Sequence, residues 1–311
     1  MNTFRKRCEV YRGWKKGYYQ LASDGWQEGK LFNRTEQFVY GMATIGLMCL
    51  KFDIKIYAFT LMPNHIHLVL SGNGKDCVAA FDYFRRRTSI RLSRDGDAPL
   101  PPDYGFKLIP IENKQQMRNH VLYVFRNAYE KGWCTPQGYP WSSGWALFSP
   151  LAAFINGQRA DKISRRKLKR LLGSHLTVPG NWEFHPALGL LPGSFVDNRL
   201  VLQLFPTVKH FQTQLVKDYE SFSKIASDLG EDLSYTIEES RDIVTQLIQA
   251  HYGNKDMQQL TAEEKSLLAV HVYNTYHLPV PLIAEALSLQ EKTVYQLVRS
   301  KDYGRSKPSG R

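Results

Sequence analysis

The hydrophobic pattern of the first 150 residues predicts an alternation of strands and helices. Short apolar runs, alternating or rich in β-branched and aromatic residues, predict four strands, at 18–23, 54–61, 65–71 and 106–111. Apolar residues at helical spacing predict three helices, at 35–51, 75–94 and from Asn113 to about Lys131, where Gly132 is a natural stop. The order β-α-β-β-α-β-α predicts an α+β fold, a ferredoxin-like split βαβ unit with one added helix.

The pattern changes after residue 150. Residues 159–170 form a basic run. The stretch 178–195 is rich in proline and glycine, which predicts a linker or an extended wrap, and residues 198–229 have helical spacing. We therefore expect three parts: an α+β domain, a basic connector with helical and extended segments, and a mainly helical domain, over residues 1–150, 151–230 and 231–311.

The chain is strongly basic. Its 311 residues include 41 Lys and Arg against 29 Asp and Glu, which gives a formal net charge of +12 and a pI of about 9.4. The hydrophobic content of 43% is ordinary for a globular protein. A charge of this size and sign indicates a polyanionic partner, with nucleic acid more favoured than an acidic membrane surface.

Cysteine spacing and the apolar runs limit the class of protein and its compartment. The four cysteines are Cys8, Cys49, Cys77 and Cys134. Their spacing gives neither a CxxC pair nor a disulfide framework, so we expect reduced thiols and no cysteine-based zinc site. The basic N-terminus lacks a following apolar segment, and the longest apolar stretch, 42–50, is too short to span a bilayer. We expect a cytoplasmic protein with no membrane partner.

Two histidines on one predicted strand are the first candidates for chemistry. They follow a turn at Met62-Pro63-Asn64, and the alternation of a strand puts His65 and His67 on the same face. Two imidazoles at this spacing can chelate one divalent ion, but such a pair needs a third ligand to make a site. The alternative is a pair of exposed or hydrogen-bonded histidines on a half-buried strand.

A second pair lies on the last predicted helix of this domain. Tyr123 and Asn127 are four residues apart and therefore share one helix face. An amide oxygen suits the third ligand of a metal ion, and a phenol beside it suits a nucleophile, whose ordinary pKa of about 10 means that the site must help it lose its proton. The ion would act as a Lewis acid on a scissile phosphate. Spacing alone favours ordinary packing of the helix face, because such pairs are common in helices.

Three segments together resemble the IS200-like Y1 transposase family, and among its branches the REP-associated tyrosine transposases most closely. They are YAFTLMPNHIHLVL at 57–70, YVFRN at 123–127 and YPWSS at 139–143, and the resemblance spans about residues 15–148. It implies that His65 and His67 are the metal ligands of an HUH (histidine-hydrophobe-histidine) endonuclease and that Asn127 is the polar third ligand.

The resemblance also implies a reaction and its partners. Tyr123 matches the nucleophile that forms a covalent 5′-phosphotyrosine and frees a 3′-hydroxyl. The implied cofactor is Mg²⁺ or Mn²⁺, and the implied substrate is single-stranded DNA that carries an imperfect hairpin next to a short guide sequence.

The helix after Tyr123 departs from the family pattern. Relatives commonly continue Asn-Pro-Val-Arg-Ala-Gly, whereas this chain has NAYEKG at 127–132, which puts the local DNA contacts in doubt but leaves the ligand and the nucleophile in place. Tyr129 is an alternative nucleophile, but six residues correspond to about 600° of helical rotation, so it points away from the face of Tyr123. His120 is a candidate proton shuttle, and the alternative is a packed or solvated histidine.

Basic side chains in two segments are candidate DNA contacts. The predicted helix 75–94 contributes Arg85, Arg86, Arg87 and Arg91, and the run at 159–170 contributes Arg165, Arg166, Lys167, Lys169 and Arg170. Such side chains bind phosphates without reading sequence, and the alternative for each segment is a solvated charged face. Trp141 and Trp145 could stack on bases, although the turn at Tyr139-Pro140 favours packing for Trp141.

The last part of the chain predicts a helix-turn-helix motif. Thr261 and Glu264 form a capping box that opens one helix, and two shorter helices at 279–288 and 290–299 follow, joined by a tight turn. In this interpretation DNA is contacted in the major groove, or along a hairpin stem, by Lys292, Thr293, Tyr295 and Arg299. The alternative is a plain three-helix bundle that docks on the N-terminal domain.

Together these observations predict a metal-dependent endonuclease and transposase that cuts and rejoins single-stranded DNA next to hairpins, as a monomer or a homodimer. Two alternatives stay open. One is a non-catalytic, sequence-specific DNA-binding regulator derived from a transposase. The other is a hydrolytic metallonuclease or phosphodiesterase that uses water and forms no covalent protein adduct.

Overall fold

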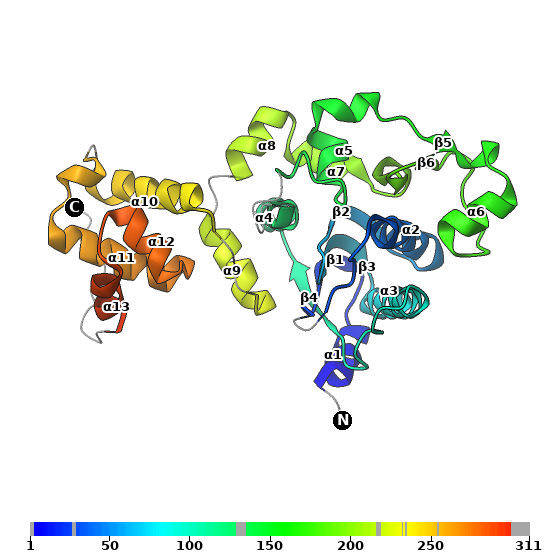
Figure 1. The fold of residues 1–311 in the computed structure, drawn as a ribbon, viewed down its shortest axis with the longest axis horizontal. Coiled ribbons are helices and arrows are strands. Elements are labelled where there is room, and N and C mark those ends of the chain that lie inside the picture. The colour runs from blue at the N-terminus through cyan, green and yellow to red at the C-terminus, as the bar shows by residue number, and fades with distance from the viewer. Residues whose placement is uncertain are drawn as a thin grey trace. The chain divides into compact units, whose positions relative to one another are not determined.

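The computed structural model describes residues 3–26, 29–128, 135–215, 219–231, 233, 235–253 and 255–299. The chain divides into two compact units (Figure 1): unit 1 contains Met1–Tyr129 and Trp133–Phe211, and unit 2 contains Glu130–Gly132 and Gln212–Arg311. Within the described ranges no helix combines the length and the hydrophobicity needed to cross a bilayer.

Unit 1 is built on a four-stranded sheet. Its strands run antiparallel to their neighbours in the order β2-β3-β1-β4, with the bounds Gly17–Ser23 for β1, Lys55–Leu61 for β2, Ile66–Gly72 for β3 and Phe106–Ile111 for β4. The four predicted strands are thus all present. The order of elements along the chain and this pairing are compatible with the predicted α+β, split βαβ fold.

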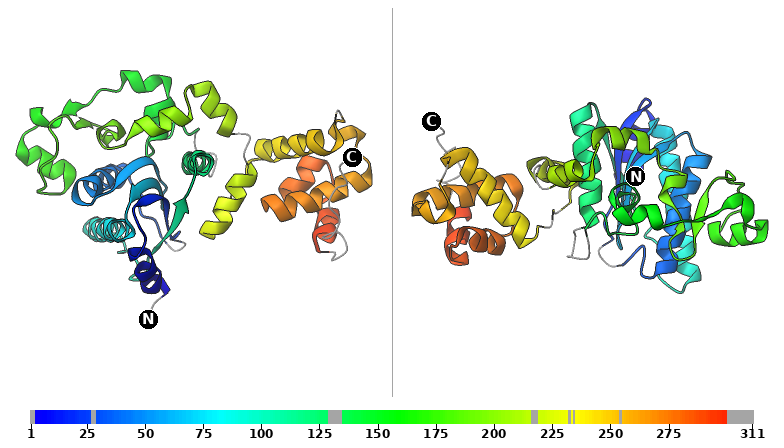
Figure 2. Two further views of the ribbon diagram at one scale, coloured as in Figure 1. Left: turned by 180° about the vertical axis from the view of Figure 1, so that it is seen from behind. Right: turned by 90° about the horizontal axis from the view of Figure 1, so that it is seen from above.

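Helices cover both faces of this sheet (Figures 1 and 2). One face carries α1 (Thr3–Arg12), α2 (Thr35–Lys51) and α3 (Gly74–Arg94), and the opposite face carries α4 (Lys114–Arg126). The first of these helices was not predicted. Its apolar side chains Phe4, Cys8 and Tyr11 lie in the core at helical spacing, although charged residues separate them in the sequence.

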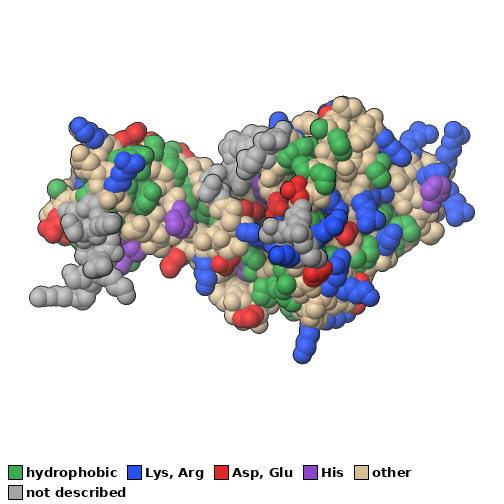
Figure 3. Space-filling model, turned by 90° about the horizontal axis from the view of Figure 1, so that it is seen from below, with side chains coloured by type: hydrophobic (Ala, Val, Ile, Leu, Met, Phe, Trp, Pro, Cys, Tyr) green, Lys and Arg blue, Asp and Glu red, His purple; other side chains and the backbone are tan. Residues whose placement is uncertain are grey.

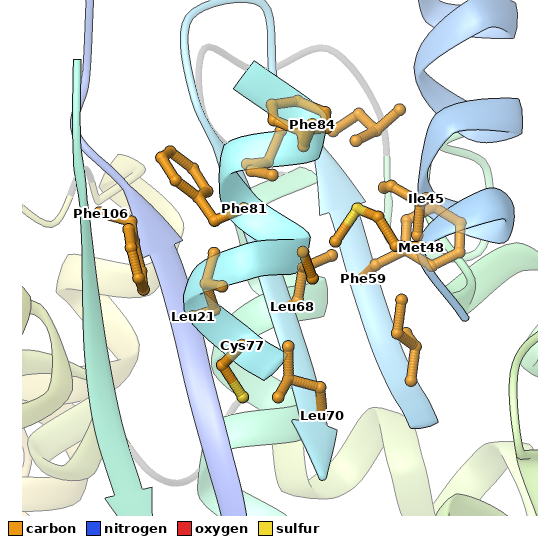
Figure 4. Close-up of a cluster of buried hydrophobic side chains, with 14 of the residues drawn as sticks. Leu21, Ile45, Met48, Phe59, Leu68, Leu70, Cys77, Phe81, Phe84 and Phe106 are labelled. Atoms are coloured by element: carbon orange, nitrogen blue, oxygen red, sulfur yellow. The ribbon is translucent and has the colours of Figure 1, made fainter. Parts of the chain in front are cut away.

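The main core lies between the sheet and the helices α2 and α3 (Figure 4). Leu21, Leu68 and Leu70 of the strands meet the aromatic side chains of α3, Phe81 and Phe84, with almost no exposed surface. Each such side chain stabilises the fold by about 1.5–3 kcal/mol through burial. The register of β3 is therefore strongly fixed, because a slip by one residue would turn its leucines away from this core.

The same register fixes what the other face of the sheet presents to α4. His67 pairs with Ala22 of β1, and Val69 pairs with Gln20, so these four side chains share one face. Leu68 and Leu70 alternate with them on the core side. The polar side chains of β1 and β3 are thereby directed at α4.

Residues 151–211 belong to unit 1 and do not form a separate connector. A small sheet in the order β5-β6-β7 packs on α2 through Trp182, Phe184 and Leu190, which meet Ala43 and Leu47 of that helix. The elements of this region are α5 (Gly144–Phe148), β5 (Gln158–Arg159), α6 (Arg165–Leu172), β6 (Glu183–His185), β7 (Gly189–Leu190), α7 (Asn198–Leu204), α8 (Val208–Leu215) and the 3-10 turns Pro150–Phe154, Ala160–Lys162 and Pro192–Ser194.

The close approach of this small sheet depends on a glycine. A Cβ atom on Gly46 of α2 would lie 2.4 Å from the side chain of Leu190, which is closer than real Cβ contacts. The predicted division, with 151–230 as one connector, thus differs from the structure because scattered apolar residues of this segment find their partners on α2, far away in the sequence.

The described part of unit 2 is helical, as predicted for the C-terminal domain. It contains α9 (Tyr219–Leu229), α10 (Ile237–Tyr252), α11 (Ala262–Tyr276), α12 (Val280–Leu287), α13 (Glu291–Arg299) and a 3-10 turn at Met257–Gln259. The predicted capping box is present: Thr261 and Glu264 exchange side-chain to backbone hydrogen bonds of 2.8 and 3.2 Å. A second capping box, Thr236 with Glu239, opens α10.

Candidate active site

The segment Met62–His65 forms the tight turn between β2 and β3. The amide of Met62 donates to the carbonyl of His65 over 2.9 Å, which leaves Pro63 and Asn64 as a two-residue loop. The loop is anchored because the carbonyls of Pro63 and Asn64 accept 3.0 Å hydrogen bonds from the amides of Phe32 and Trp26. His65 is therefore the last residue of the turn, one position before β3 begins.

The two histidines lie side by side on the face toward α4. The centroids of the His65 and His67 rings are 4.7 Å apart, and the ring planes are nearly perpendicular. Between them, the amide of Ile66 donates to Oγ of Ser23 over 2.9 Å, and the same oxygen accepts a 2.7 Å bond from the hydroxyl of Tyr104. The end of β1 thus holds the backbone between the histidines in place.

Helix α4 brings the tyrosine and the asparagine to these rings. Asn113 caps the start of α4 by accepting from the amide of Gln116, as its position in the sequence predicts. The ring of Tyr123 meets that of His67 edge to face, with centroids 5.6 Å apart. Asn127 follows the last residue of α4, and the part of the predicted helix from Tyr129 onward lies outside the described residues.

The orientation of the Asn127 side chain follows from its hydrogen bonds. Its Nδ2 donates to the carbonyl of Tyr123 over 2.9 Å, and a carbonyl only accepts, so the nitrogen has to occupy this side of the amide. The oxygen Oδ1 then faces the histidines and lies 3.4 Å from Nε2 of His65. The structure thus brings together all four residues, His65, His67, Tyr123 and Asn127, that the motifs singled out.

These four side chains are shielded from solvent. The exposed fractions are 8% for His65, 0% for His67, 2% for Tyr123 and 4% for Asn127. Burial lowers the pKa of His67 to about 3, although a hydrogen bond with Asn127 acts in the opposite direction. His67 is therefore neutral at physiological pH, which is the form in which imidazole binds a metal ion.

The chemistry of the donors fits a divalent cation. Nδ1 of His65 lies 2.9 Å from Oδ1 of Asn64, and in the neutral tautomer that donates there, Nε2 presents a lone pair toward the oxygen of Asn127. The two atoms, Nε2 of His65 and Oδ1 of Asn127, lie 3.4 Å apart, and adjacent ligands of an octahedral ion are separated by about 3 Å.

A metal ion at these histidines would need the amide oxygen of Asn127 as a further ligand. Among the described residues no three His, Cys, Asp or Glu side chains lie close enough to share a metal ion. Two imidazoles and an amide oxygen are a mixed nitrogen and oxygen set, and Mn²⁺ accepts nitrogen ligands more readily than Mg²⁺ does. His65, His67 and Asn127 are thus the residues that could hold an ion here.

Thr60 is a residue of this site that the sequence did not indicate. Its buried hydroxyl donates to the carbonyl of Val124 over 2.7 Å and so joins β2 to the turn of α4 that follows Tyr123. A threonine within a predicted strand gives no sign of such a long-range role, because Thr is common in strands for its branched shape alone.

The YPWSS segment supports β2 from its outer edge. The amides of Leu61 and Ser143 donate to the carbonyls of Trp141 and Phe59 over 2.8 and 3.0 Å, and the hydroxyl of Tyr139 donates to the carbonyl of Leu61 over 2.7 Å. Trp141 stacks on Phe38 with centroids 5.0 Å apart. Packing is therefore the role of Trp141 in this structure.

The second tryptophan of this segment is buried as well. Trp145 is 6% exposed, and its indole donates to the carbonyl of Pro140 over 2.9 Å. A buried ring with its only donor engaged does not offer a face to a base, so the structure assigns a packing role to Trp145 too.

His120 is held by the sheet. It is 6% exposed, and its Nδ1 forms a hydrogen bond with Oε1 of Gln20 on β1. Burial lowers the pKa of His120 to about 4, so the ring is neutral at physiological pH. The predicted role as a proton shuttle stays a prediction, and the contact with Gln20 adds a role in seating α4 on the sheet.

The arginines of α3 divide into bound and exposed side chains. Arg87 donates to the carbonyls of Leu172 and Gly173 at the end of α6, over 2.6 and 3.2 Å, and Arg91 pairs with Asp95 at 2.7 Å. Arg85 donates to the carbonyl of Pro102 over 2.9 Å. Of the four arginines of α3 that were predicted to contact DNA, only Arg86 is exposed.

Helix α6 presents an exposed basic surface. Leu172 is buried against α2, while the helix exposes its five cations, Arg165, Arg166, Lys167, Lys169 and Arg170. Within the described ranges none of these five forms an ion pair. In Figure 3, Lys and Arg side chains gather at the end of unit 1 where α6 lies. This surface is available to a polyanion.

The predicted contacts of the C-terminal motif all lie on α13. Lys292, Thr293, Tyr295 and Arg299 are exposed there, and Tyr295 shows half of its surface. They belong to unit 2.

Comparison with known proteins gives one partial match. No family model matches the chain, and no curated protein matches its sequence. The match is a solved structure of a REP-associated tyrosine transposase bound to a REP hairpin. The aligned region covers 45% of this chain and 84% of the transposase chain, with 19% sequence identity and a TM-score of 0.37. Because this similarity is weak, the assignment of function has to come from the residues of the site.

Proposed function

We propose that this protein is a metal-dependent endonuclease and transposase that cleaves single-stranded DNA next to a hairpin and uses Tyr123 as its nucleophile. One observation carries the proposal: two imidazoles, an amide oxygen and a phenol, from segments about sixty residues apart, converge in one buried site. This combination supports the proposal because it could hold a divalent ion beside a nucleophile.

The proposed reaction is a transesterification. The phenolic oxygen of Tyr123 forms a bond to phosphorus, and the bond between phosphorus and the 3′-oxygen breaks. The phenolic proton passes to that oxygen, directly or through solvent, and leaves a free 3′-hydroxyl. The downstream strand stays attached to the protein through its 5′-phosphate, and the reverse reaction with a 3′-hydroxyl rejoins two strands.

The residues of the chain divide the remaining work. His65, His67 and Asn127 would hold a divalent ion, which would act as a Lewis acid on the scissile phosphate. Asn64 orients His65, and the carbonyl of Tyr123 orients Asn127. Exposed cations of α6 and Arg86 of α3 would bind DNA phosphates and supply affinity without sequence preference.

The burial of the nucleophile has a consequence for this proposal. Tyr123 is 2% exposed, so a phosphodiester reaches its hydroxyl only after the site opens. The same burial favours a second candidate function, a DNA-binding regulator whose site stays closed and makes no cut. The two functions predict different products and are separated by one assay.

The assay is a denaturing gel of the full-length protein with a hairpin-bearing single strand whose flanking segments are randomised, in Mn²⁺. A 3′-label should move with the protein as a covalent adduct, and a 5′-label should appear in a shorter free strand. Both products should disappear with chelator and in Tyr123→Phe. Tyr129→Phe is the matched control and should behave as wild type.

Other outcomes identify the alternatives. Shorter strands without an adduct mean that water is the attacking group. If the adduct still forms in Tyr123→Phe and is lost in Tyr129→Phe, the nucleophile is Tyr129. Binding without any cut from the randomised pool supports the regulator.

A further inference from the structure

The last three helices of unit 2 form a compact motif around a sharp turn. Only Ser288, Leu289 and Gln290 separate α12 from α13, and Ser288 adopts a left-handed conformation with φ of 52°. The amide of Leu289 donates to the carbonyl of Ala284 over 2.8 Å and closes the end of α12. Two helices joined by such a short turn hold α13 in a fixed direction.

One face of α13 is buried and the other is open. Val294 has no exposed surface, and α13 packs against α11 and α12. The opposite face carries a stripe at helical spacing, formed by Lys292, Tyr295, Gln296 and Arg299. These four side chains and Glu291 line a hollow on the surface of α13.

The side chains of this stripe are those that read base edges. Arg and Lys donate to guanine, and Gln both donates to and accepts from adenine, in the major groove of duplex DNA. Tyr295 and Arg299 are both exposed, and the guanidinium of Arg299 lies 4.9 Å from the ring centre of Tyr295. Neither Lys292 nor Arg299 forms an ion pair within the described part of the chain, so both are available to a ligand.

The charge of unit 2 is divided in the same way. Residues 212–290 contain five Lys and Arg against twelve Asp and Glu, whereas residues 291–311 contain six Lys and Arg against two Asp and Glu. On the face drawn in Figure 3, blue side chains are numerous over unit 1 and sparse over unit 2. Because an acidic surface repels DNA, a nucleic acid has to approach unit 2 from the segment that begins with α13.

We propose that α13 is a recognition helix that binds the major groove of double-stranded DNA in a sequence-dependent manner. The chain then carries two DNA sites of different kind: a buried transesterification site in unit 1 and a duplex-reading surface in unit 2. This second site does not require the cleavage chemistry, and it would direct the protein to a particular duplex sequence.

The test uses the full-length chain with Tyr123→Phe, so that no DNA is cut. Selection from a random double-stranded library should enrich a short sequence motif. Against the selected duplex, Gln296→Ala and Arg299→Ala should each weaken binding about tenfold and relax the preference at one base pair. Lys292→Ala should weaken binding to all duplexes alike. Lys224→Ala, an exposed cation on α9 of the same unit, is the matched control and should leave affinity unchanged.

Three outcomes would overturn the proposal. They are a library in which no motif is enriched, a motif whose binding is unaffected by the α13 substitutions, and equal binding of single-stranded and duplex forms of the selected sequence. Circular dichroism of each variant checks that the fold is retained. The same α13 substitutions are also made in the chain that retains Tyr123. Their adduct formation on hairpin DNA measures the cleavage reaction independently of duplex binding.

Discussion

The hydroxyl of Thr60 on β2 donates a 2.7 Å hydrogen bond to the main-chain carbonyl of Val124, the residue after Tyr123. The last carbonyls of a helix have no partner within the helix. Thr60 supplies one for Val124, and the side chain of Asn127 adds a second donor to the carbonyl of Tyr123, which also accepts from the backbone amide of Asn127. The end of α4 is therefore closed by the same residues that build the candidate site.

Removal of this bond should loosen α4. Thr60→Val keeps the shape of the side chain but leaves a buried carbonyl without its donor, so we expect a loss of about 1–3 kcal/mol in the free energy of unfolding. The yield of adduct should fall as well, because Tyr123 is less well placed. Thr60→Ser retains the hydroxyl and serves as the control. Urea unfolding and the gel assay measure the two effects, and equal stability of the Val and Ser variants would contradict this role.

Asn127 should control the affinity for the metal ion. Asn127→Ala removes the oxygen that faces His65, so half-maximal adduct formation should need at least about tenfold more Mn²⁺. Asn127→Asp keeps an oxygen and should lose less. Titration of Mn²⁺ in the gel assay tests this, and the same half-maximal concentration in wild type and Asn127→Ala would exclude Asn127 as a ligand.

His120 should make the stability of the protein depend on pH. Its pKa is about 4 in the folded chain, against about 6.5 when unfolded, so between these values only the unfolded chain takes up the proton. This contribution is complete above pH 6.5 and is lost as the pH falls toward 4.

The size of the effect follows from the same two values. Between pH 7 and pH 5 the free energy of unfolding of wild type should fall by about 2 kcal/mol more than that of His120→Gln. Both proteins are measured in the presence of a chelator, which excludes an effect of metal binding. Urea unfolding at the two pH values measures the difference. Parallel pH profiles for the two proteins would mean that the buried ring is not the source.

The basic surface of α6 should contribute to DNA affinity through counterion release. Replacing Arg165, Arg166, Lys169 and Arg170 by Ala removes exposed charges without touching the buried face of the helix. The slope of log affinity against log salt for single-stranded DNA should become shallower by up to about 3, since each phosphate contact contributes about 0.7. An unchanged slope would place the DNA elsewhere.

Arg87 provides the contrast to that experiment. It is also basic, but it is bonded to the carbonyls that end α6. Arg87→Ala should therefore lower stability by about 1–3 kcal/mol and change the salt slope little. Thermal unfolding and anisotropy titrations distinguish the two classes of arginine, and a large change in slope with intact stability would reverse the assignment.

Local patterns in the sequence were sufficient for the main sheet of unit 1 and for most of the helices that cover it. The four strands and the helices α2 and α3 follow from hydrophobic periodicity, because burial on one face leaves a regular trace in the sequence. The capping box of Thr261 and Glu264 could also be predicted, because capping is a contact between residues only one turn apart. Helix α1 was not predicted, although Phe4, Cys8 and Tyr11 have the spacing of an amphipathic helix.

Relationships between distant segments were decided only by the tertiary structure. The sequence placed His65 and His67 on one face and Tyr123 and Asn127 on another, but spacing within each segment says nothing about the distance between them. That distance follows from α4 packing on the face of the sheet opposite to α2 and α3. The same holds for Arg87, whose bonds to the end of α6 no local pattern reveals.

The sequence by itself thus determined the four strands of the main sheet, many of the helices, the basic charge and the four candidate site residues. The tertiary structure decided that these four converge, that Tyr123 is buried, that the small sheet and α6 pack on α2, and which arginines are exposed. The physical reason is that periodicity and capping are set by neighbours in the chain, whereas burial and hydrogen bonding across the core depend on which faces pack together.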